Sequence, residues 1–101
     1  MRQPPELRGQ ACLKPGTREQ CLAPARICIE ASRKDPGCIS YDLHLSVSDP
    51  DRMVFIEVWE SRAALDAHFQ TEHFKAWRAA IADHVVSRKL EVITPASIET
   101  I

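Results

Sequence analysis

A strictly alternating segment near the middle of the chain constrains the fold more than any other feature. Between residues 39 and 47, polar side chains separate a series of large apolar or aromatic ones. Side chains of a β-strand point alternately to opposite faces, so this pattern predicts a strand with one buried face. Residues 48–51 have turn-forming side chains, and residues 53–60 are predicted to return as the second strand of a hairpin. The large alternating residues are Ile39, Tyr41, Leu43, Leu45 and Val47.

The predicted return strand is apolar on both faces. Valine and isoleucine occupy positions 54, 56 and 58, whereas Phe55, Glu57 and Trp59 occupy the alternate positions. A strand with apolar side chains on both faces is usually covered on both. We therefore expect helices on one face of the sheet and a second copy of the chain on the other.

The register of the hairpin decides which polar side chains share a face with the aromatic ones. In the register that we predict, the turn pairs Val47 with Arg52. One face then carries three cross-strand pairs, which are His44 with Phe55, Asp42 with Glu57, and Ser40 with Trp59. A slip of one residue would move the pairing to the other face. We interpret the polar face either as a stripe exposed to solvent or a partner, or as the wall of a substrate pocket.

Two further segments complete a four-stranded sheet. Residues 6–13 and 89–94 alternate and are predicted to be strands. With the helical segments between them, the order is β-α-β-β-α-β. This order is typical of the ferredoxin-like α+β fold, an antiparallel four-stranded sheet with helices on one face.

Capping residues mark where the helices begin. Thr17 and Gln20 are predicted to form a capping box, and Ser61 and Thr71 are predicted N-caps. Pro24 lies beyond the first turn of the first helix, where it removes a hydrogen bond, so we expect a kink or a new start there. The helices after Ser61 and Thr71 are expected over residues 62–70 and 72–84.

Length and charge restrict the possible functions. A chain of 101 residues fits one domain, and we predict a flexible arm over residues 1–5 and a single domain over residues 6–101. A domain of this size buries only about two thirds of the surface of its unfolded chain, which favours self-association. A net charge of −1 offers no basic surface for nucleic acid. No apolar run approaches the ~20 residues of a membrane span.

The N-terminus and the cysteines predict a cytoplasmic protein. The first residues, MRQPPELRGQ, lack the apolar core of a signal peptide. The four cysteines form no C-x-x-C pair. Without a secretory signal, we expect them to be small buried or half-buried hydrophobic residues rather than disulfides.

Three segments resemble the antibiotic biosynthesis monooxygenase (ABM) domain family, and within it the quinol monooxygenase-like proteins. These segments are residues 37–41 (GCISY), 55–61 (FIEVWES) and 65–74 (LDAHFQTEHF). The resemblance implies a homodimer in which two ferredoxin-like protomers form a dimeric α+β barrel. It also implies oxidation of a small aromatic quinol or phenol with dioxygen, without flavin, haem or metal. The expected partners are therefore a small aromatic substrate, dioxygen and a second copy of the chain.

The resemblance also suggests which residues form the site. It places His68 and His73 near the pocket, and neutral imidazole suits proton abstraction near pH 7, so one of them is the expected general base, with Asp42 as the alternative proton acceptor. Each histidine could instead be a hydrogen-bonded structural group. Their spacing of five residues does not fit a helical metal pair, and we expect no metal site from them alone. The expected substrate-binding residues are His44, Asp42, Phe55, Glu57, Trp59 and Trp77, with core packing as the alternative for the tryptophans.

A second function stays open on the same scaffold. Glu72 stands where the family often has proline, and an extra carboxylate could make the pocket more polar. The alternative is therefore a non-oxidative isomerase or a binding module for a small ligand.

Overall fold

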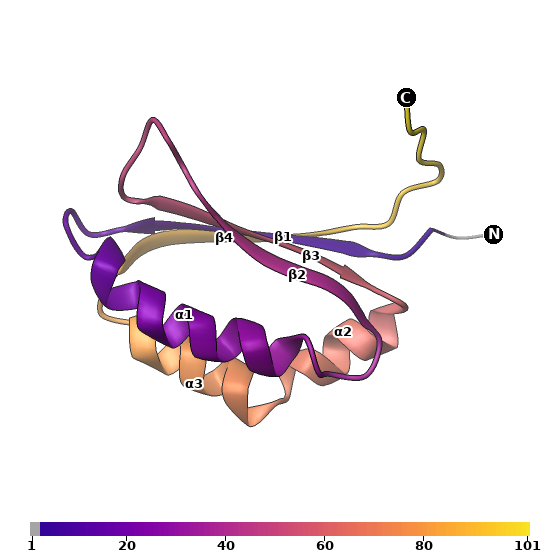
Figure 1. The fold of residues 1–101 in the computed structure, drawn as a ribbon, viewed down its shortest axis with the longest axis horizontal. Helices are drawn as coiled ribbons and strands as arrows, with labels where there is room; N and C mark the ends of the chain where they lie inside the picture. The colour runs from indigo at the N-terminus through magenta and orange to yellow at the C-terminus, as the bar shows by residue number, and fades with distance from the viewer. Residues whose placement is uncertain (1–2) are drawn as a thin grey trace.

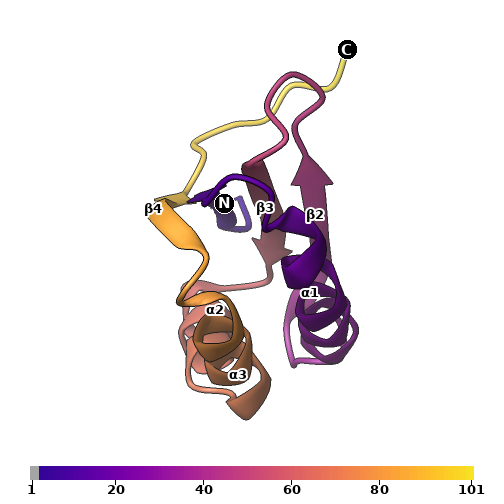
Figure 2. The same cartoon turned by 90° about the vertical axis from the view of Figure 1, so that its left-hand side faces the viewer.

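The computed structural model describes residues 3–101 and has the predicted ferredoxin-like α+β fold. Four antiparallel strands form one sheet in the order β2-β3-β1-β4. All three helices lie on the same side of the sheet, and the other face is bare (Figure 1). Seen from the end, α1 lies under β2 and the other two helices lie on the side of β4 (Figure 2). The elements are β1 (Glu6–Leu13), α1 (Arg18–Ser32), β2 (Cys38–Leu45), β3 (Arg52–Trp59), α2 (Arg62–Phe69), α3 (Glu72–Ile81) and β4 (Val85–Ile93).

The predicted hairpin register is wrong by one residue. Leu43 pairs with Phe55 and Tyr41 pairs with Glu57, so these side chains face the helices together. Burial explains the choice, because the observed register places Tyr41, 2% exposed, in the core. Asp42 and His44 therefore point to the bare face, where both are exposed.

Helix α1 is continuous through Pro24, which corrects the predicted new start. The predicted capping box is also wrong, because the Thr17 hydroxyl donates to the Lys14 carbonyl at 2.8 Å and makes no capping bond. Small side chains on one face allow this helix to approach the sheet closely. The buried positions are Cys21, Ala25, Cys28 and Ser32.

The predicted caps of the two later helices are confirmed. The Ser61 side chain accepts from the Ala64 amide, and the Thr71 side chain accepts from the Phe74 amide. Helix α3 ends at Ile81, and β4 already begins at Val85, earlier than predicted.

The ends and the bare face of the sheet bear on the remaining predictions. Of the predicted N-terminal arm, residues 1–2 lie outside the described residues, while Pro5 is buried and its carbonyl accepts from the Trp59 amide at 3.0 Å. On the bare face, Val54, Ile56 and Val58 are half-buried in the single chain. No described helix has the length and apolarity needed to cross a membrane.

Candidate functional site

A small cavity lies between the sheet and helix α3. Its free volume is about 40 Å³, and its walls are mainly apolar and aromatic. Strand β1 contributes Gly9, whose missing side chain leaves space between Phe55 and Leu90. The polar residues in the lining are Gln10, Tyr41, Glu57, Arg78 and Arg88.

Glu57 is the only carboxyl group among the described residues that line this cavity. Glu57 is only 3% exposed, and its Oε1 accepts a hydrogen bond from Trp59 Nε1 at 3.1 Å. Burial raises the pKa of Glu57 from 4.5 to about 7, and hydrogen bonds from Trp59 and Tyr41 oppose that rise. A carboxyl with such a pKa exchanges its proton readily near neutral pH.

Tyr41 faces Glu57 across the hairpin, and sequence reasoning treated it only as a strand residue. Its hydroxyl lies 3.6 Å from the Cys28 sulfur. Burial, followed by the nearby charge of Glu57, raises the pKa of Tyr41 far above its ordinary value. Tyr41 therefore remains a neutral phenol and can donate a hydrogen bond into the site.

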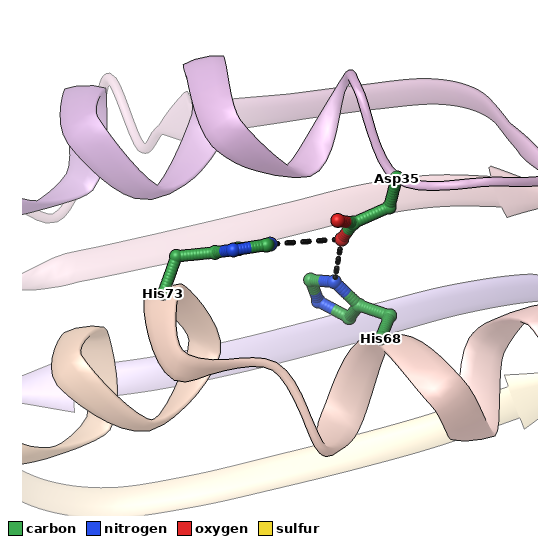
Figure 3. A group of neighbouring side chains, drawn as sticks. All are labelled: Asp35, His68 and His73. Carbon is green, nitrogen blue, oxygen red and sulfur yellow. Dashed lines mark hydrogen bonds and ion pairs between the residues drawn. The ribbon is translucent and has the colours of Figure 1, made fainter.

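Two histidines share one carboxylate oxygen of Asp35 (Figure 3). Nδ1 of His68 and Nε2 of His73 each lie 2.8 Å from Oδ2 of Asp35. The α1–β2 turn supplies Asp35, the last turn of α2 supplies His68, and the first turn of α3 supplies His73. The shared oxygen thus ties three separate elements together.

His68 is held as a neutral ring with one free nitrogen. Burial lowers its pKa, and the hydrogen bond to Asp35 partly offsets that effect. A neutral ring that donates from Nδ1 carries a lone pair on Nε2. That Nε2 is buried and has no hydrogen-bond partner among the described residues.

The same three residues are the group of described side chains that could hold a metal ion. Their ligand atoms all lie within 4.8 Å of one another, and two imidazoles with one carboxylate suit a divalent transition metal. The two hydrogen bonds already satisfy all three atoms, so the arrangement is complete as a hydrogen-bonded cluster.

His68 connects this cluster to the cavity through aromatic contacts. Its ring centre lies 4.7 Å from that of Trp59, whose indole N–H holds Glu57. It also lies 5.4 Å from the Tyr41 ring and 5.2 Å from the Phe74 ring, and both of these line the cavity. The position of the histidine can therefore influence the groups that face a ligand.

The structure separates the residues expected at the site into three groups. Phe55, Glu57 and Trp77 line the cavity. Trp59, His68 and His73 do not belong to its lining, and Asp42 and His44 lie on the opposite face of the sheet. Sequence reasoning missed four residues, which are Asp35, Tyr41, Arg78 and Arg88. Of these, only Tyr41 could have been found from the sequence, because shifting the hairpin register by one residue places it opposite Glu57.

Fold and cavity together define a ferredoxin-like chain with a buried carboxyl group in the lining of a mainly apolar cavity. The chain belongs to the antibiotic biosynthesis monooxygenase family, whose family model matches residues 10–80.

The chain is also similar to individual known proteins. The chain is 44% identical over 66 residues to the uncharacterized protein sll1783 of Synechocystis, a match that covers 65% of this chain and 45% of that protein. It is 39% identical over 70 residues to the "Probable quinol monooxygenase YgiN" of Escherichia coli, covering 61% of this chain and 67% of that protein. The solved structure of Rv0793 from Mycobacterium tuberculosis is similar with a TM-score of 0.87 at 26% identity, over 97% of this chain and all of that one.

Proposed function

We propose that this chain is a cofactor-independent monooxygenase that oxidises a small phenol or quinol with dioxygen. The observation that carries the proposal is Glu57, a buried carboxyl with a pKa of about 7 that faces a mainly apolar cavity. A general base works best when its pKa lies near the working pH. Membership of the family and the name of the Escherichia coli relative support the substrate class.

The reaction needs a base, an oriented ring and exclusion of water. Glu57 takes the proton of the substrate hydroxyl, and the resulting phenolate gives one electron to dioxygen. The substrate radical and superoxide combine at a ring carbon that bears hydrogen, and the peroxide anion takes the proton back from Glu57. Loss of water from the peroxide leaves a quinone, so one oxygen atom enters the product and the other leaves as water. The apolar walls hold the radical pair together and keep solvent out.

Aromatic side chains position the ring. Phe55 and Trp77 meet edge to face, with ring centres 5.5 Å apart, and both line the cavity. Such surfaces suit a flat aromatic ligand. The free volume of about 40 Å³ must grow to admit a ring, and the side chains of Phe74 and Arg78 on this wall are only half-buried.

We assign the histidine cluster a positioning role. Asp35 fixes His68, the His68 ring packs on Trp59, and Trp59 orients the Glu57 carboxylate. The expected role of His68 or His73 as the base is the competing assignment, and the unpaired Nε2 of His68 favours it. Both assignments lead to the same overall reaction.

Oxygen uptake by the Glu57→Gln variant tests the proposal. We expect kcat/KM to fall by about 100-fold or more, because a positioned base contributes roughly that much. The wild-type rate should rise with pH through about 7, where the carboxylate forms, and the variant should lose this dependence. Assays with chelator present and flavin removed, over a panel of phenols and quinols, measure both effects.

Matched variants separate the possible results. Glu60→Gln changes the exposed neighbouring carboxyl and should leave the rate unchanged. If Glu57→Gln keeps full activity while His68→Gln loses it, the base is the histidine. Uptake no faster than autoxidation across the whole panel would rule out the oxygenase itself. Glu72, which motivated the non-oxidative alternative, is exposed and does not line the cavity.

We also propose that two copies pair through the bare face of the sheet, where Val54, Ile56 and Val58 form an apolar strip. Sedimentation equilibrium should give twice the chain mass of 11.4 kDa at micromolar concentration. Ile56→Lys should shift the chain to monomer, since it places a charge in the strip. Val47→Lys, at an exposed position beyond the end of β2, should remain a dimer. A monomeric wild type contradicts the pairing.

A further inference from the structure

Two arginines without acidic partners lie side by side at the mouth of the cavity. Arg78 comes from α3 and Arg88 from β4, and both line the cavity. Both also line the shallow surface hollow between the end of α3 and the start of β4. Because they belong to the inner and the outer surface at once, they stand where a ligand would enter.

The sheet register aims Arg88 at this mouth. Arg88 pairs with Ala11 of β1, and Leu90 pairs with Gly9. Ala11, Gly9 and Leu90 all line the cavity, so the side chain of Arg88 projects from the same face of the sheet. Its direction follows from backbone pairing and does not depend on a flexible loop.

Neither guanidinium is neutralised within residues 3–101. Other arginines, such as Arg33 and Arg62, form ion pairs with aspartates. The guanidinium of Arg78 lies over the Phe74 ring, with its central carbon 5.7 Å from the ring centre. Partial burial and the neighbouring charge of Arg78 lower the pKa of Arg88. Two like charges held together in this way favour an anion between them.

The two ends of the cavity differ in charge. Glu57 and Tyr41 lie deep in the lining, and Arg78 and Arg88 lie at its mouth, with aromatic walls between them. A ligand that matches this arrangement has a hydroxyl at one end, a flat ring and an anionic group at the other. Guanidinium groups bind a carboxylate with charge-assisted, often bidentate hydrogen bonds.

We propose that Arg78 and Arg88 form a carboxylate-binding pair, so that the substrate is an aromatic acid that carries a phenolic or quinol hydroxyl. This inference rests on the proposed function for the phenolic part. It adds the charged group that selects among phenols and quinols.

Anaerobic binding of two matched ligands tests the pair without requiring turnover. The probes are 2,5-dihydroxybenzoate and its neutral amide, 2,5-dihydroxybenzamide. Titration calorimetry measures the affinity of each. Wild type should bind the acid at least about tenfold more tightly, since hydrogen bonds to charged groups contribute roughly that much. Arg88→Gln and Arg78→Gln should each remove most of this preference by weakening the binding of the acid.

Controls separate a specific site from general charge effects. Arg88→Lys keeps the charge and should retain part of the preference, whereas Arg62→Gln, at an exposed position of α2, should leave it intact. Equal affinity for acid and amide, or a preference that survives both glutamine variants, would overturn the proposal. If the acid binds selectively but no oxygen is consumed, the monooxygenase proposal fails while the arginine pair stands. If neutral quinols are oxidised but the acid is not preferred, the arginine-pair proposal fails while the monooxygenase proposal stands.

Discussion

Gly37→Ala is expected to lower the free energy of unfolding by about 2 to 5 kcal/mol, as the sum of two effects. Gly37 has φ of 82°, a left-handed conformation that side-chain-bearing residues adopt at a cost. A Cβ at this position would also lie 2.6 Å from the Cβ of Ala64 on α2. Urea denaturation followed by circular dichroism measures the loss.

A matched glycine isolates the steric part of this effect. Gly16 has φ of 78°, but a Cβ there would meet no atom within 4 Å. Gly16→Ala should therefore cost only about 1 to 2 kcal/mol, from the backbone alone. If Gly37→Ala costs no more than Gly16→Ala, helix α2 moves away freely and the packing argument is wrong.

A double variant tests the contact directly. Ala64→Gly removes the methyl group that the new side chain would strike. In that background, the cost of Gly37→Ala should fall to the Gly16→Ala value, and the difference is the coupling energy of the pair. The result matters for the site because Gly37 belongs to the turn that carries Asp35, and its carbonyl accepts from the Glu60 amide at 2.8 Å.

Glu57→Gln should make the protein more stable than wild type at alkaline pH and should change the pH dependence of stability. The native pKa of Glu57 is about 7, above its ordinary value of 4.5. Between these two values the native state keeps a proton that the unfolded state has lost, so wild-type stability falls as pH rises. The full loss, reached above pH 7, is about 3 kcal/mol.

The measurement compares free energies of unfolding near pH 4.5 and about pH 8. The difference between Glu57→Gln and wild type should grow by about 2 to 3 kcal/mol between these conditions. Glu60→Gln, at an exposed position, should show little change. An equal difference at both pH values would mean that the native carboxyl ionises as it does in the unfolded chain. That result would also contradict the proposal that burial raises the pKa of Glu57 and so makes it a suitable general base.

Local sequence signals were sufficient for most of the architecture. The alternation over residues 39–47 and the caps at Ser61 and Thr71 predicted elements that the structure contains. Such signals act within a strand or a helical turn, so one segment is enough to read them. Pro24 shows the limit of this reasoning, because the packed face of α1 keeps the helix continuous through it.

The site depended on contacts between distant segments. Asp35 meets His68 and His73 across separations of 33 and 38 residues, and no local pattern encodes that meeting. The arginine pair likewise requires α3 to lie beside β4.

The family of the chain and its order of elements could thus be determined from residues that are neighbours in sequence. Strand periodicity, helix capping and the family motifs are all local signals. The tertiary structure decided the hairpin register, because only the packed core selects which face of β2 is buried. That choice placed Tyr41 opposite Glu57 and turned Asp42 and His44 outward. It also decided the chemistry of Glu57, because a carboxyl acquires a pKa of about 7 only when the fold removes it from water.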